Sequence, residues 1–162
     1  MIRGDLRVVT RALGEPIRTF ARAARVRLVL LLDRSGQVLA QQGFTRDYEI
    51  SAVASLAAAA HSSAQALASL TGTTGWTHLH HAGRELQLFL APFRTPGSEL
   101  ILVAIFDRDS TLGLVQHYFE EFAGVVASLP QLATEKGEGS AETFEADLEA
   151  GLRAIAPPDW LR

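Results

Sequence analysis

Residues Leu100-Ile-Leu-Val-Ala-Ile-Phe106 form an unbroken apolar run that leads directly into Asp107-Arg-Asp-Ser-Thr-Leu-Gly113. Seven consecutive apolar residues are typical of a central β-strand buried on both faces. The Asp, Ser and Thr side chains that follow can accept hydrogen bonds from the free N–H groups of a helix N-terminus. Apolar residues then recur at helical spacing, at Leu112, Val115, Phe119, Phe122, Val126 and Leu129. The stretch predicts a strand, a polar cap and a closing helix at about 111–128.

The first part of the chain predicts a helix and a hairpin. Apolar residues at helical spacing begin at Leu6, but Gly14-Glu-Pro16 interrupts them, and Pro is favoured in the first turn of a helix. We therefore expect a looser arm followed by a helix at about 15–24. Strands are expected at 26–32 and 37–42, because Asp33-Arg-Ser-Gly36 between them has the chemistry of a tight turn.

The middle of the chain completes the element order. A long helix is expected at 47–70, and two further strands at 76–81 and 85–92, joined by Ala82-Gly-Arg84. The order is therefore α-β-β-α-β-β-β-α, which indicates an α+β domain. Pro130 ends the last helix, so the domain is assigned to residues 1–130.

The long helix has two contrasting sides. Its larger apolar residues, with small alanines between them, predict a face that packs on the sheet; they are Ile50, Val53, Leu56, Leu67 and Leu70. The other side is small and uncharged, and includes Ser55, Ala59, Ser62, Ser63 and Ala66. An ordinary solvent-facing side carries Glu, Lys or Arg. The missing charges favour a protein interface, the alternative being that Ala is simply a good helix former.

Composition excludes several function classes. Residues 1–27 hold seven Arg against two acids, while the whole chain has a net charge of −3. Nucleic-acid binding would need stacking aromatics beside those arginines, and only Phe20 lies near them, so solvated arginines are the favoured interpretation. No apolar run approaches the ~20 residues that span a bilayer, so we expect no membrane insertion. The lack of Cys fits a cytoplasmic location.

No motif for catalysis or cofactor binding is present. There is no Walker A sequence and no G-x-G-x-x-G, and without Cys there is no thiol nucleophile. His78 and His80 would share one face of a strand, as two metal ligands would, but no third ligand is evident. Ordinary edge-strand histidines explain them more simply. We expect no catalytic residue, cofactor or metal.

The C-terminal region differs from the domain before it. Residues 131–142, including Thr134-Glu-Lys-Gly-Glu-Gly-Ser-Ala141, are typical of a flexible linker. Residues 143–162 then predict a short amphipathic helix, with an apolar stripe at Phe144, Leu148, Leu152 and Ile155 and an apolar tip at Trp160. About a dozen residues cannot hold a helix alone, so this segment must dock on something.

Taken in order, several stretches resemble the Roadblock/dynein-light-chain family, and within it the bacterial MglB group of GTPase-activating proteins. They are Val29-Leu-Leu-Leu-Asp33-Arg-Ser-Gly36-Gln-Val38, Val53-Ala-Ser-Leu56-Ala-Ala58, Leu102-Val-Ala-Ile-Phe106-Asp107 and Ser110-Thr-Leu-Gly113-Leu-Val115. The resemblance covers about 15–129, and the C-terminal linker and short helix also resemble the MglB group. The Arg-rich N-terminal arm and the near-absence of Lys depart from it.

The resemblance implies a five-stranded antiparallel sheet flanked by helices, and a homodimer in which third strands and long helices meet their symmetry mates. The dimer strand would contain Trp76, His78, Leu79 and His80. The paired helices would form a platform for a Ras-like small GTPase, and Ser55, Ala59, Ser62, Ser63 and Ala66 would contact either the sister helix or the GTPase. Phe144, Leu148 and Trp160 would contact the GTPase from a second side.

Three functions follow from the sequence and the resemblance. The favoured one is a non-enzymatic GTPase activator in bacterial cell polarity or gliding motility. It would either donate an arginine finger, with Arg46, Arg94 and Arg108 as loop candidates, or remodel the switch regions of the GTPase. The uncharged platform favours remodelling. The alternatives are a dimeric scaffold that binds a GTPase without stimulating hydrolysis, and a ligand-sensing domain, which would need a polar-lined cavity.

Overall fold

The computed structural model describes residues 6–133, and the predictions for the linker beyond Ala133 and for the C-terminal segment lie outside this range. The described elements are α1 (Leu6–Ala23), β1 (Leu28–Asp33), β2 (Val38–Gly43), the 3₁₀ turn η1 (Thr45–Asp47), α2 (Ile50–Leu70), β3 (Leu79–Ala82), β4 (Gln87–Arg94), β5 (Glu99–Phe106), α3 (Leu112–Ala127) and the 3₁₀ turn η2 (Pro130–Leu132). The predicted order of helices and strands is confirmed.

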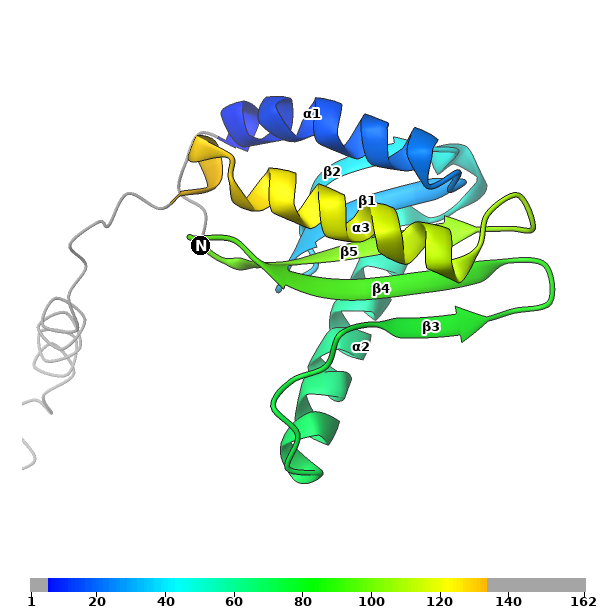
Figure 1. Cartoon of the computed structure of the whole chain (residues 1–162), viewed down its shortest axis with the longest axis vertical. Coiled ribbons are helices and arrows are strands. Elements are labelled where there is room, and N and C mark those ends of the chain that lie inside the picture. The colour runs from blue at the N-terminus through cyan, green and yellow to red at the C-terminus, as the bar shows by residue number, and fades with distance from the viewer. Residues whose placement is uncertain (1–5, 134–162) are drawn as a thin grey trace, which may run out of the picture.

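The five strands form one open antiparallel sheet in the order β2-β1-β5-β4-β3 (Figure 1). The quoted apolar run is β5, which lies at the centre between β1 and β4. Its alternate side chains point to opposite faces. Leu102 and Phe106 enter the core on one face, and Ile101 and Val103 enter the core on the other. The prediction of a strand buried on both sides is therefore correct.

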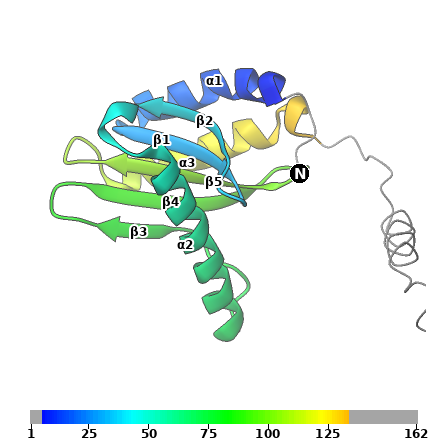
Figure 2. The ribbon, with the colours of Figure 1, turned by 180° about the vertical axis from the view of Figure 1, so that it is seen from behind.

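Helices cover both faces of the sheet unequally. α1 and α3 lie side by side on one face, and α2 crosses the other face (Figures 1 and 2). The larger core lies beneath α1 and α3, and η2 adds Leu132 to it. The smaller core lies beneath the first half of α2. Within residues 6–133, no helix combines the length and the apolar character needed to cross a membrane.

The predicted start of the first helix is wrong. α1 begins at Leu6 and passes through Gly14 and Pro16 without a break. The reason is the continuous buried stripe that includes Val9 and Leu13. Burial of these two side chains, about 1.5–3 kcal/mol each, offsets the cost of about 1 kcal/mol for Gly and about 3 kcal/mol for Pro in a helix interior.

Two local predictions at turns have different outcomes. The turn after β1 forms as expected, because the Asp33 carboxylate accepts hydrogen bonds from the Ser35 and Gln37 N–H groups and Gly36 has a φ of +87°. The cap of α3, however, is Thr111, whose hydroxyl accepts from the Leu114 N–H at 3.2 Å. The Asp107 carboxyl instead accepts the Asp109 N–H and contacts Arg27, and both interactions lower its pKa.

Gly43, the last residue of β2, gives a direct test of how closely the end of β2 approaches the start of β1. It has a φ of +115°, and a β-carbon there would collide with the Arg27 carbonyl oxygen. We expect Gly43→Ala to lower the free energy of unfolding by about 1–3 kcal/mol, measured by denaturant titration. The matched control is Gly124→Ala, in α3, where a methyl group meets nothing within 4 Å. It should raise the free energy of unfolding by about 0.5–1 kcal/mol. If both variants changed the free energy of unfolding by the same amount in the same direction, the close approach of Gly43 to Arg27 would not be what makes glycine necessary at position 43.

Candidate protein-binding surface

α2 is longer than the sheet it crosses. Its 21 residues extend for ~31 Å at 1.5 Å per residue. Five strands spaced ~4.8 Å apart are ~19 Å wide from first to last. Because α2 runs across the strands, its C-terminal half projects beyond β3, as Figures 1 and 2 both show. The sheet of this chain therefore cannot cover the whole helix.

Burial along α2 changes where the helix leaves the sheet. Ile50 and Val53 pack against the smaller core, and Ala54 and Ala57 are buried within it. The predicted sheet-packing stripe is wrong for its other leucines: Leu56 is 71% exposed, Leu67 62% and Leu70 85%. Leu67 and Leu70 lie on the projecting half, and Leu56 points away from the sheet. These leucines form an apolar strip that residues 6–133 leave uncovered.

The small side chains predicted as a platform all lie on the solvent side. Ser55, Ala59, Ser62, Ser63 and Ala66 are exposed. The hydroxyl of Ser62 donates to the Ala58 carbonyl oxygen at 3.1 Å, so it needs no partner from outside. No Asp, Glu, Lys or Arg lies between Ile50 and Leu70. The exposed leucines flank this small-residue stripe, so α2 presents a smooth, uncharged surface with one bulky apolar side.

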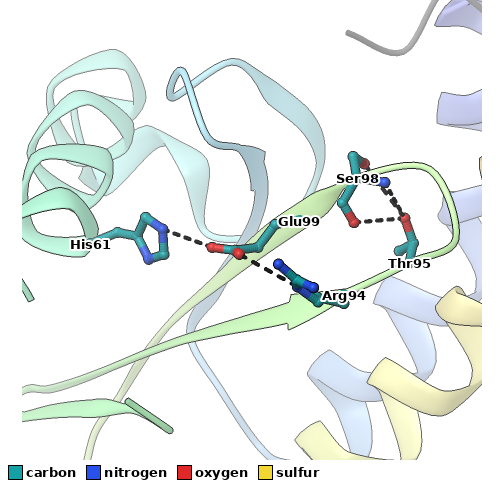
Figure 3. A network of polar contacts seen from close by, with 5 residues as sticks. All are labelled: His61, Arg94, Thr95, Ser98 and Glu99. Carbon is teal, nitrogen blue, oxygen red and sulfur yellow. Dashed lines mark hydrogen bonds and ion pairs between the residues drawn. The ribbon is translucent and has the colours of Figure 1, made fainter. Parts of the chain in front are cut away.

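A buried polar contact anchors α2 at the middle of its length. His61 Nε2 lies 2.9 Å from the Glu99 Oε1 at the start of β5, and both side chains are largely buried (Figure 3). The contact falls outside hydrogen-bond geometry, and within the described residues neither atom has a hydrogen-bond partner. Thr95 and Ser98 close the β4–β5 turn that positions Glu99, through a Ser98 N–H donated to Thr95 Oγ1 at 3.1 Å.

The segment after α2 holds the projecting half in place. Thr71 donates its hydroxyl to the Leu67 carbonyl oxygen at 2.9 Å, and the Thr73 N–H donates to the Ala68 carbonyl oxygen at 2.9 Å. The chain then returns to the sheet at Trp76, whose ring lies 5.4 Å from the ring of His61. The end of α2 is thus fixed through its own carbonyl groups and a folded-back loop.

The strand beside this overhang is a free edge. β3 pairs with β4 on one side only, and all four of its residues are exposed. The predicted strand at 76–81 is wrong at its start, because Trp76 and His78 precede β3, which begins at Leu79 and includes His80. His80 lies 2.8 Å from the Gln87 side-chain oxygen and stacks on Phe106. Within residues 6–133, no group of three His, Asp or Glu side chains could hold a metal ion.

Sequence reasoning missed the exposed leucines and the His61–Glu99 contact. The exposure of Leu67 and Leu70 could have been predicted, because at 3.6 residues per turn they project on a different side of the helix from Ile50. The contact could not have been, since His61 and Glu99 are 38 positions apart and no periodic pattern links them. His61 points toward the sheet because it follows Ala54, Ala57 and Ala58 on the buried side.

Glu99→Ala tests whether the buried contact anchors α2. The change leaves the buried imidazole of His61 without its carboxylate, and we expect a loss of about 1–3 kcal/mol in the free energy of unfolding. Arg94→Ala is the matched control, because Arg94 is 88% exposed and contacts the same carboxylate at 4.0 Å. Exposed ion pairs contribute little, so this variant should unfold like the parent chain in a denaturant titration. Comparable losses in both variants would refute the anchoring role.

Comparisons with known proteins agree with this geometry. The comparison with curated proteins gave no match. Among solved structures, Myxococcus xanthus MglB is similar with a TM-score of 0.70 and 23% identity, over 85% of this chain and 98% of that one. The gliding protein MglB from Thermus thermophilus is similar with a TM-score of 0.65 and 27% identity, over 78% of this chain and 92% of that one. A structure described as MglB with tetrameric arrangement is similar with a TM-score of 0.64 and 28% identity, over 78% of this chain and 91% of that one.

The family assignment rests on the sequence match. The model of the Roadblock/LC7 domain matches residues 14–106, more than half of the chain. That range contains the whole sheet and all of α2, and the observed sheet order and helix positions are consistent with it. The chain belongs to the Roadblock/LC7 family.

Proposed function

We propose that this protein is a homodimeric, non-enzymatic activator of a Ras-like small GTPase, acting in bacterial cell polarity or gliding motility in the cytoplasm. Family membership and the similarity to MglB structures support a regulator of the Roadblock type. The observation that carries the proposal is the projecting, uncharged α2 beside the free edge of β3. Both features leave surface that a second copy would cover.

The dimer would form through β3 and α2 together. An exposed strand edge presents unpaired N–H and C=O groups, and pairing with the same strand of a second copy satisfies them symmetrically. In the arrangement we propose, the overhang of α2 reaches across the seam to the sister helix. Leu79 is in β3, while Trp76 and His78 would approach the sister chain from the segment before it.

We divide the α2 surface between the two partners by side-chain size. Leu56, Leu67 and Leu70 would pack in the dimer, where each buried side chain contributes about 1.5–3 kcal/mol. The small stripe, including Ser55, Ala59 and Ser62, would remain outside as the GTPase platform. Small side chains allow a partner's backbone to approach closely, and the lack of charge avoids desolvating an ion in the complex.

The proposed mechanism is remodelling rather than donation of an arginine. Ras-like GTPases hydrolyse GTP slowly when their water-orienting residue and a stabilising cation are not held in place. No cation lies on α2. The platform would therefore favour a switch conformation in which residues of the GTPase itself reach the phosphate.

Leu67→Arg and Ser62→Arg test the division of the α2 surface. Leu67→Arg places a charge in the proposed dimer contact, so sedimentation should give a monomer and GTP hydrolysis should no longer be stimulated. Ser62→Arg places the same side chain on the proposed platform. That variant should remain dimeric and lose stimulation at least tenfold. A dimeric Leu67→Arg variant, or a fully active Ser62→Arg variant, would disprove the division.

A second test concerns the arginines. Replacing Arg46, Arg94 and Arg108 singly with Ala should each leave single-turnover GTP hydrolysis within about twofold of the parent activator. Loss of a true arginine finger reduces the rate by about 10³–10⁵. A variant that keeps its affinity for the GTPase but loses stimulation on that scale would identify a finger and contradict remodelling.

The alternative is a dimeric Roadblock scaffold that binds a GTPase without stimulating it. The same α2 platform supports this function, because binding alone needs no more than complementary surfaces. Single-turnover hydrolysis by the GTPase that co-purifies with the chain separates the two. Strong stimulation by catalytic amounts supports an activator, and tight binding with an unchanged rate supports the scaffold.

A further inference from the structure

A second apolar surface lies on the opposite face of the sheet, between α1 and α3. It is a groove of about 300 Å³. The α1 side is formed by Pro16, Thr19, Phe20 and Ala23, and the α3 side by Tyr118, Phe122 and Val125. The rings of Phe20 and Phe122 meet at 5.5 Å and make its floor. This surface is separate from α2 and from the edge of β3.

The groove is open to solvent although its lining is apolar. Val125 is 50% exposed, while Phe20 and Phe122 are buried. Pro16 contributes to the opening, because it presents only a compact ring to the groove. Contiguous exposed apolar surface usually marks a binding site. An occupant needs a matching apolar stripe and a compatible charge.

The C-terminal sequence of the same chain has this character. Phe144, Leu148, Leu152 and Ile155 fall on one side of a helix, as expected for a segment that lies in an apolar groove. From Phe144 to Ile155 such a helix would extend for ~16 Å, against ~12 Å of α1 between Glu15 and Ala23. The stripe is therefore long enough to cover the groove.

Net charge also favours contact between the C-terminal segment and α1. Residues 134–162 hold seven acids against three basic residues, whereas α1 holds four Arg against one Glu. Arg11, Arg18 and Arg22 are exposed along α1, and Arg18 pairs at 2.7 Å with Glu15, which lines the α1 side of the groove. The α3 side also carries an acidic residue, Glu121, whose partner at 3.4 Å is His117 and not an arginine. The acids of the segment would therefore face α1 and not α3.

The linker between Ala133 and the C-terminal segment is long enough to reach the groove. The described chain ends at Ala133, after Leu132 has packed into the core beside α1 and α3. Residues 134–142 supply nine residues, which span up to ~30 Å when extended. The groove begins about nine residues along α1 from its first turn, or ~14 Å. A short tether also gives the segment an effective concentration in the millimolar range.

We propose that residues 143–162 dock as an amphipathic helix in the α1–α3 groove of their own chain when no partner is bound. The apolar stripe lies against Phe20, Phe122 and Val125, and the acidic side lies along the arginines of α1. The segment is then held away from the α2 platform. Docking would weaken as salt concentration rises, because its electrostatic part is screened.

Paramagnetic broadening in the full-length chain tests this placement. The chain has no Cys, so Ala146→Cys carries a single nitroxide on the side of the segment opposite the apolar stripe. We expect amide peaks of Thr19, Ala23 and Val125 to lose at least half of their intensity relative to the reduced nitroxide. The amide peaks of α2, on the opposite face of the sheet, should keep their intensity.

Two pairs of variants in the labelled chain make the test specific. Leu148→Ser with Leu152→Ser should abolish the broadening, and Ala150→Ser, on the opposite side of the segment, should preserve it. Val125→Glu should also abolish it, and Val8→Glu should not, since Val8 is 49% exposed and lies outside the groove. These surface changes leave the buried core intact.

The remaining outcomes overturn the proposal. Unbroadened groove peaks would mean that the segment does not dock there in the free chain, as expected if it binds only a GTPase. Broadening on α2 would place it on the platform. A mixed sample distinguishes the two subunits of a dimer. It combines isotope-labelled chain that has no Cys with spin-labelled chain that has no isotope label. Broadening of the groove peaks in that sample would mean that the groove holds the segment of the sister subunit. The readout does not involve a GTPase, so it is independent of the proposed function.

Discussion

The organisation of this protein follows from a mismatch in length: a 21-residue helix crosses a sheet only five strands wide. The C-terminal half of α2 has no sheet of its own chain beneath it. Leu67 and Leu70 on that overhang lie on the same side of the helix as Leu56, away from the sheet, so a partner packed on that side would cover them. Pairing β3 with a second copy would bring the sister helix close to this side. The mismatch therefore links the overhang of α2, the open strand edge and the proposed dimer.

The overhang must be rigid to serve as a binding platform, and the chain holds it at two points. His61 meets Glu99 at 2.9 Å where α2 leaves the sheet, and Thr71 and Thr73 bind the last carbonyl groups of the helix. Between these points α2 has no Asp, Glu, Lys or Arg that could form a different ion pair. The buried pair joins α2 to the start of β5 at one position along the helix.

Much of the fold could be predicted because hydrophobic periodicity is a local signal. β5 was recognisable from seven apolar residues, and the turn at Asp33 from its side-chain chemistry. α1 was mispredicted because Pro16 is a strong local signal, and only tertiary burial of Val9 and Leu13 overrides it. The site was predicted in part. Small uncharged residues identified the exposed side of α2, but the leucines lie on that side too, because Ala54, Ala57 and His61 are the residues that face the sheet.

Electrostatics separates the two faces of the domain. The α2 face offers no cation between Ile50 and Leu70, so it has nothing to attract a segment with a net charge of −4. The α1 face presents exposed arginines beside an apolar groove. An acidic amphipathic segment brought near both surfaces would therefore prefer α1 and α3, although each surface is apolar enough to hold it. In the docked state that we propose, the charge asymmetry along the sequence, basic at the start and acidic at the end, would direct the C-terminal segment to one face and leave the other free for a partner.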